Sequence, residues 1–196
     1  MMILDVEHLK DAKITLTLIF LNAINFILFN LALPEEYILN FVQINGNIIY
    51  EYEYWRLITS MFLHADILHL FSNMIALLLF GATVENNRYV SKLEFVLIYF
   101  ISGLIGNLFT LWLLPTYAIS LGASGAIFGL IGASFIIVAT ENRALLPIAL
   151  IYVAYYIFAS FSPGINIWAH IFGLIGGMLI GYIIYSRRKK LILNYE

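Results

Sequence analysis

The sequence predicts an all-α membrane protein, a bundle of six transmembrane helices with an interfacial first loop. Of its 196 residues, 62% are hydrophobic and only 11% are charged, whereas soluble domains average roughly 45–50% apolar and about 25% charged residues. A bilayer-spanning helix takes roughly 20 residues. The apolar content therefore leaves room for about six spans and excludes a water-soluble globule.

Six long apolar runs are bounded by charged or turn residues. Lipid offers no partners to a polypeptide backbone, so only helices and closed barrels cross the hydrocarbon. The runs are continuous rather than alternating, which favours helices. The predicted helices cover residues 14–33, 67–84, 95–114, 121–140, 145–161 and 167–185. We expect them to form a single membrane domain over residues 1–196.

The basic residues predict how the bundle is oriented. An even number of helices puts both termini on one side of the membrane, and every basic residue except Arg56 falls on that side. These residues are Lys10, Lys13, Arg88, Lys92, Arg143, Arg187, Arg188, Lys189 and Lys190. Positive charge marks the cytoplasmic side. We therefore expect a cell-membrane protein with cytoplasmic termini and with the loops at 34–66, 115–120 and 162–166 outside.

The long loop at residues 34–66 mixes aromatic side chains with acidic ones. Tyr54 and Trp55, for example, lie close to Glu51 and Glu53. Aromatic residues of this kind prefer the headgroup level of a bilayer. We expect the loop to form short helices that lie on or in the outer leaflet.

Four polar side chains lie near the outer ends of the second, fourth and sixth predicted helices. These helices run from outside to inside, and His69, Ser124 and His170 lie within about one turn of their beginnings. Asn73 lies one turn deeper than His69 on the same helix face. Because an ionisable group within a span is costly, it indicates a functional site.

Two stripes of small residues predict which helices pack together. They consist of Gly125, Gly129 and Ala133 on the fourth helix, and of Ala169, Gly173, Gly177 and Gly181 on the sixth. Such stripes let helix backbones approach closely. If the two stripes pack together, Ser124 and His170 come near hydrogen-bond range.

This arrangement indicates acyl-transfer chemistry. A serine hydroxyl is a poor nucleophile until a base takes its proton, and His170 is the base at the right depth. The spans hold no acid that could be a third member, so the pattern predicts a Ser/His dyad. Candidate donors to an oxyanion are the His69 imidazole, the Asn73 amide and the Ser124 backbone N–H. This chemistry calls for no metal and no organic cofactor.

Other functions stay open on these residues alone. Histidine or asparagine in a membrane helix often only bonds to another helix, and His69 and His170 could instead bind a haem or a quinone. Against haem, the glycine stripe predicts tight packing beside His170. The net charge of −2 argues against nucleic-acid binding. The absence of cysteine excludes a thiolate nucleophile or thiolate metal site.

At these residues the chain resembles the rhomboid intramembrane serine proteases. The resemblance covers essentially the whole chain in its minimal six-helix form. The motifs that carry it are Trp55 and Arg56 in the first loop, His64 and the run His69, Leu70, Phe71, Ser72 and Asn73, then Gly81 and Glu85, then Gly122, Ala123, Ser124 and Gly125, and finally Ala169, His170, Ile171, Phe172 and Gly173.

The resemblance implies a protease that cuts transmembrane segments of other proteins. It makes Ser124 the nucleophile and His170 the general base, with His69 and Asn73 in the oxyanion site. It also suggests that substrates approach through the bilayer beside the fifth helix and the loop at 162–164. Many rhomboids carry tyrosine where this chain has Phe128, so ring packing under the histidine is kept while a hydroxyl is lost. A rhomboid-like protein that binds membrane helices without cutting them is a further alternative.

Overall fold

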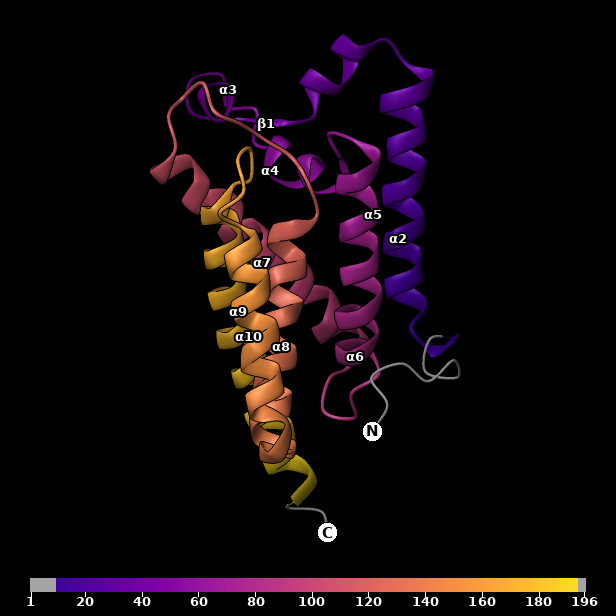
Figure 1. Cartoon of the computed structure of the whole chain (residues 1–196), viewed down its shortest axis with the longest axis vertical. Helices are drawn as coiled ribbons and strands as arrows, with labels where there is room; N and C mark the ends of the chain where they lie inside the picture. Colours follow the sequence, from indigo (N-terminus) through magenta and orange to yellow (C-terminus); the bar gives the residue numbers. More distant parts are fainter. Residues whose placement is uncertain (1–9, 194–196) are drawn as a thin grey trace.

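The computed structural model describes residues 10–193, apart from the side chains of residues 189 and 191–193. Over this range the chain is a bundle of helices with one small β-ladder at one end (Figure 1). The side chain of Lys189, used above to predict orientation, lies outside the described residues. Residues 1–9 and 194–196 of the expected domain lie outside them as well.

Each of the six apolar runs contains a helical rod. In chain order the rods are α2 (Lys13–Phe26) with the π-helix η1 (Ile27–Ala32); α5 (Ile67–Ala76) with the π-helix η4 (Leu77–Gly81) and α6 (Ala82–Glu85); α7 (Lys92–Leu113); α8 (Ser124–Glu141); α9 (Leu146–Ala159), preceded by the 3-10 turn η5 (Arg143–Leu145); and α10 (Ile167–Leu193).

Five of these rods are long and apolar enough to cross a membrane. They are Lys13–Ala32, Ile67–Glu85, Lys92–Leu113, Ser124–Glu141 and Ile167–Arg188. The remaining rod, Arg143–Ala159, is apolar but shorter than 18 residues, whereas a full span takes roughly 20. The all-α membrane bundle is thus supported with five candidate spans, and the sixth span stays a prediction.

The two ends of the bundle differ in character. In Figure 1, α2 begins and α10 ends at the lower end, while α3, α4 and β1 of the first loop gather at the opposite end. This arrangement agrees with the expected placement of the termini on one side. The side of the membrane that each end faces stays a prediction.

The first loop is folded into short elements. They are η2 (Glu35–Asn40), β1 (Gln43–Ile44), α3 (Asn45–Tyr50), α4 (Arg56–Thr59) and η3 (Ser60–Phe62). A feature that the sequence did not predict is the antiparallel pairing of β1 with β2 (Ile119–Ser120), in which Gln43 lies opposite Ser120. The pairing ties the first loop to the segment that leads into α8.

Arg56 anchors the first loop from inside. Its side chain is only 3% exposed, and its Nη1 donates to the carbonyl oxygens of Leu39 and Val42. Its Nε donates to the Glu53 carboxylate at 2.5 Å. Hydrogen bonds from Arg56 and then Asn47 lower the pKa of Glu53 below its usual value. Arg56, the one basic residue that the sequence predicts on the outer side, therefore has hydrogen-bond partners within the first loop.

Backbone contact between α8 and α10 forms the centre of the bundle. A Cβ atom on Gly173 would collide with the carbonyl oxygen of Gly125, and one on Gly177 would collide with that of Gly129. Further along, a Cβ on Gly181 would lie 3.0 Å from the Cα of Ala133. The predicted contact between the two small-residue stripes is confirmed.

We expect Gly177→Ala to destabilise the protein and Gly176→Ala to leave it nearly unchanged. The Cβ at 177 meets rigid backbone, and overpacking of this kind costs about 1–3 kcal/mol. The Cβ at 176 comes within 3.0 Å only of the Cδ1 atom of Ile105, the flexible end of a side chain. Thermal unfolding in detergent micelles measures both variants. Equal unfolding temperatures for the two variants would contradict the close contact of Gly177 with the α8 backbone.

Candidate active site

Ser124 is the first residue of α8 and follows a turn that requires glycine. Gly122 has φ +127°, a backbone conformation that other residues rarely adopt. Its N–H donates to the Ser60 carbonyl at 2.9 Å. A Cβ at this position would also lie 2.9 Å from the His69 ring. The turn therefore fixes where α8 begins and brings the His69 imidazole beside it.

His170 lies in the first turn of α10, and one side chain anchors that turn. The Asn166 Oδ1 accepts from the Ala169 N–H at 3.2 Å. Its Nδ2 donates to Thr110 Oγ1 at 2.8 Å and to Ser120 Oγ at 3.0 Å. These bonds join the beginning of α10 to α7 and to β2. The segments that carry Ser124 and His170 are thus linked to each other.

The structure brings Ser124 and His170 together. The distance from Ser124 Oγ to His170 Nε2 is 2.8 Å, and the histidine is 7% exposed. Phe128, one turn into α8, stacks on the imidazole with ring centroids 4.2 Å apart and an interplanar angle of 14°. The ring packing expected of Phe128 is confirmed, and it holds the imidazole plane from one face.

A second serine, which sequence reasoning did not single out, contacts the other nitrogen of His170. Ser160 Oγ lies 2.7 Å from His170 Nδ1, and the same hydroxyl donates to the Tyr156 carbonyl at 2.8 Å. Both ring nitrogens of His170 are therefore occupied by hydroxyl groups. That occupation counts against an axial-ligand role for His170 in a haem site.

His69 lies beside the serine. The Asp66 carboxylate caps α5 by accepting from the His69 N–H at 2.8 Å. The Ala65 N–H donates to His69 Nδ1 at 3.5 Å, which leaves Nε2 as the nitrogen that carries hydrogen. The His69 Nε2 and Ser124 Oγ approach the same point, at 2.9 and 3.7 Å from a Cβ built on Gly122.

Asn73 lies one turn further along α5 and is 6% exposed. Its Nδ2 donates to the His69 carbonyl at 2.9 Å. Because an amide NH₂ carries two hydrogens, one donor remains available. Among the described residues, no hydrogen bond joins Asn73 to Ser124 or His170. The structure thus places Asn73 on the helix that carries His69, one turn below it.

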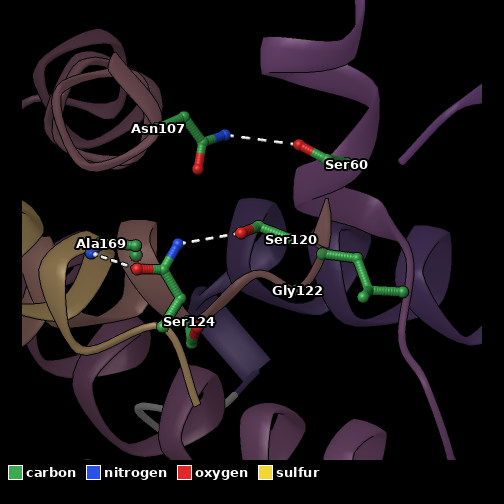
Figure 2. A pocket seen from close by; sticks show the side chains of 9 residues that line it. Ser60, Asn107, Ser120, Gly122, Ser124 and Ala169 are labelled. Atoms are coloured by element: carbon green, nitrogen blue, oxygen red, sulfur yellow. Dashed lines mark hydrogen bonds between the residues drawn. The ribbon is translucent and has the colours of Figure 1, made fainter. Parts of the chain in front are cut away.

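A polar pocket adjoins Ser124 (Figure 2). Figure 2 shows the Asn107 amide directed at Ser60, with a distance of 3.4 Å from Nδ2 to Oγ. Most of the wall of the pocket presents hydroxyl, amide or backbone groups, which can bind water. The lining residues are Ser60, Asn107, Ser120, Leu121, Gly122, Ser124, Gly125, Asn166 and Ala169.

His64 packs against His69 next to the site. It is fully buried, and its ring lies edge-on to that of His69, with centroids 5.0 Å apart. Neither of its ring nitrogens has a hydrogen-bond partner among the described residues. Burial, followed by repulsion from His69, lowers the pKa of His64 to about 3. His64 is therefore neutral at physiological pH.

We expect the buried His64 to make the protein less stable in acid. Its pKa is about 3 in the folded chain and about 6.5 in an unfolded one, so between these values the unfolded state binds more protons. The folded state therefore loses stability as the pH falls from about 6.5 toward 3. Between pH 6.5 and 5 the loss is on the order of 1–2 kcal/mol.

His64→Leu removes this contribution by putting an apolar side chain in the buried position. Thermal unfolding in detergent at pH 7.5 and pH 5.0 measures the effect, and we expect a smaller drop for the variant than for the wild type. The other histidines are present in both proteins, so their contributions cancel in the comparison. An identical drop in the two proteins would contradict a depressed pKa at His64.

Comparisons with known proteins converge on one kind of domain. A family model described as "Rhomboid domain" matches residues 51–187. The "Putative rhomboid protease YdcA" of Bacillus subtilis (strain 168) is 36% identical over 143 residues, which cover 70% of this chain and 71% of that protein. "RHOMBOID-like protein 1" of Arabidopsis thaliana is 33% identical over 147 residues, covering 71% and 37%. "Rhomboid-like protease 3" of Toxoplasma gondii is 33% identical over 138 residues, covering 66% and 51%. The similarity thus spans about a third to a half of the latter two proteins.

Proposed function

The chain belongs to the rhomboid family and is a multi-pass membrane protein, and from this premise we propose that it is an intramembrane serine endopeptidase. Its proposed substrates are other membrane proteins, cut in or near their transmembrane segments. The observation that carries the proposal is the 2.8 Å distance between Ser124 Oγ and His170 Nε2. A serine in direct contact with a buried imidazole has the base that a hydroxyl nucleophile needs.

The proposed reaction is acyl transfer through a Ser/His dyad. His170 Nε2 takes the proton of Ser124 as Oγ attacks the substrate carbonyl carbon. The imidazolium then gives that proton to the leaving amine as the peptide bond breaks. A water molecule, activated in turn by His170, hydrolyses the acyl-serine and regenerates the hydroxyl. The polar pocket beside Ser124 offers room for such water.

Three donors are proposed for the oxyanion. The Ser124 N–H stands at the beginning of α8, where backbone donors have no acceptor within the helix and the dipole favours negative charge. The His69 Nε2–H lies beside the serine. Asn73 contributes the amide hydrogen that its bond to the His69 carbonyl leaves free. All groups in this chemistry are protein groups, so no metal or cofactor is invoked.

The bilayer constrains how a substrate reaches the serine. A transmembrane helix has its backbone groups hydrogen-bonded internally, so the substrate must unwind locally before a carbonyl meets Ser124. We propose that it approaches beside α9 and the loop at 162–164. We also propose a single six-helix domain in the cell membrane, with α9 as the shortest span and the first loop at the outer interface. The termini are then cytoplasmic and the site faces outward.

We expect Ser124→Ala and His170→Ala each to abolish cleavage, and the double variant to be no worse than either single one. Groups that act as one catalytic unit lose activity in this non-additive way. The assay uses the full chain in liposomes with a panel of single-span substrates. Ser186→Ala, at the opposite end of α10, is the matched serine control and retains activity. A fluorophosphonate should label Ser124 only when His170 is intact.

Two outcomes would contradict the proposal. Cleavage by Ser124→Ala at the wild-type rate would exclude Ser124 as the nucleophile. Binding of substrate helices without cleavage or labelling, under every condition that supports folding, would indicate a rhomboid-like protein that recognises helices without cutting them.

We expect Asn73→Ala to lower kcat by up to about 10²–10³-fold, the loss typical of one oxyanion donor. Because His69 and the Ser124 N–H can compensate in part, a smaller loss of kcat would also agree with the proposal. Asn22→Ala is the matched control, because Asn22 is also buried and also donates to the carbonyl four residues earlier, at 2.7 Å. If both variants lost stability and activity in parallel, Asn73 would have only a structural role.

A further inference from the structure

The buried Ser160 hydroxyl occupies the place where many serine hydrolases have an acid. It lies 2.7 Å from His170 Nδ1, on the side of the ring opposite Ser124. Ser160 is 2% exposed and directly follows α9, where its backbone N–H bonds to the carbonyls of Tyr156 and Ile157. The hydroxyl is therefore held at a fixed point beside the imidazole.

Counting hydrogens gives the direction of each bond. A hydroxyl has one hydrogen, and a carbonyl oxygen can only accept. The bond from Ser160 Oγ to the Tyr156 carbonyl, at 2.8 Å, therefore uses the only hydrogen of Ser160. Toward His170 the same oxygen presents a lone pair, so the hydrogen of that second bond belongs to Nδ1.

This direction selects the tautomer of His170. A neutral imidazole carries its hydrogen on one nitrogen and a lone pair on the other. With hydrogen on Nδ1, the lone pair stands on Nε2, which lies 2.8 Å from Ser124 Oγ. That is the form which can take a proton from the serine. The opposite tautomer would direct an N–H at Ser124 and could not act as its base.

We propose that Ser160 is a positioning residue that holds His170 in the tautomer and orientation needed to deprotonate Ser124. The inference rests on the proposed function, since it extends the Ser124/His170 dyad by one partner. In the acylation step the proton passes from Ser124 Oγ to His170 Nε2. Nδ1 keeps its hydrogen and donates it to Ser160 throughout. Ser160 keeps its own hydrogen on the Tyr156 carbonyl, so no proton passes through it.

The orientation of the ring depends on two contacts of different kinds. Phe128 stacks on the imidazole and fixes the plane of the ring, but it leaves rotation within that plane free. The bond to Ser160 removes this rotation, because it pins Nδ1 while Ser124 lies at Nε2. Phe128 and Ser160 together therefore define one placement of the base.

Ser160→Thr and Ser160→Val form a matched pair that tests the proposal. The two side chains have nearly the same shape, and only threonine keeps the hydroxyl. We expect Ser160→Val to lower kcat about 10- to 100-fold with little change in KM, the range seen when a histidine loses an orienting partner in metal sites. Ser160→Thr should keep most of the wild-type kcat. The rate of fluorophosphonate labelling at Ser124 should follow the same order.

The tautomer is measured directly by ¹⁵N NMR of the imidazole in the full chain, with His170 assigned from the His170→Ala spectrum. In the wild type we expect hydrogen on Nδ1, and in Ser160→Ala a shift toward hydrogen on Nε2. This measurement needs no cleavage, so it also serves if the added methyl groups of the Thr and Val variants prevent folding. A wild-type spectrum with hydrogen on Nε2 would overturn the inference.

The outcomes separate this inference from the proposed function. Cleavage that survives Ser124→Ala overturns the proposed function whatever Ser160 does. Loss of cleavage in Ser124→Ala, combined with equal kcat values for Ser160→Thr and Ser160→Val, overturns only the role of Ser160.

Discussion

The close contact between the backbones of α8 and α10 decides whether the proposed site exists. Bringing helices together in lipid buries no extra apolar surface from water, so the approach depends on van der Waals contact along small residues. Gly173 of α10 meets the backbone of Gly125 of α8. Gly125 directly follows Ser124, and Gly173 lies about one turn after His170. A hydrogen bond weakens beyond about 3.2 Å. A separation of these helices by the width of a methyl group would therefore break the 2.8 Å contact from Ser124 to His170.

Polar groups at the end of the bundle that carries the first loop fix the register of the contact between α8 and α10. The buried Asn45 in α3 donates to the carbonyl oxygens of Thr110, Leu114 and Pro115, which lie in the last turn of α7 and just after it. Asn166 joins the start of α10 to Thr110 and Ser120. The first loop thus caps α7 and pairs with the segment leading into α8. It contributes to the position of Ser124 through backbone geometry.

Sequence reasoning anticipated the contact between Ser124 and His170 because its signals were strong. Ser124 and His170 are polar residues in apolar runs, and glycines at a spacing of four indicated the helices that meet. The β1–β2 pairing was missed because two residues per strand are too few to show an alternating pattern. Ser160 gave no signal, since a serine at a helix end is common. Its bond to His170 exists only through the packing of α9 on α10, which sequence spacing does not reveal.

A hydroxyl partner suits the proposed role of His170 as a base buried among membrane helices. A carboxylate beside His170 would stabilise the imidazolium more, but burying a charged group among membrane helices is costly. Ion pairs such as Lys92 with Glu85 and Arg56 with Glu53 lie toward the ends of helices or in the first loop. Within the proposed site the partners of His170 are neutral hydroxyls. With these neutral partners, the contacts of His170 place no further charge beside the imidazole.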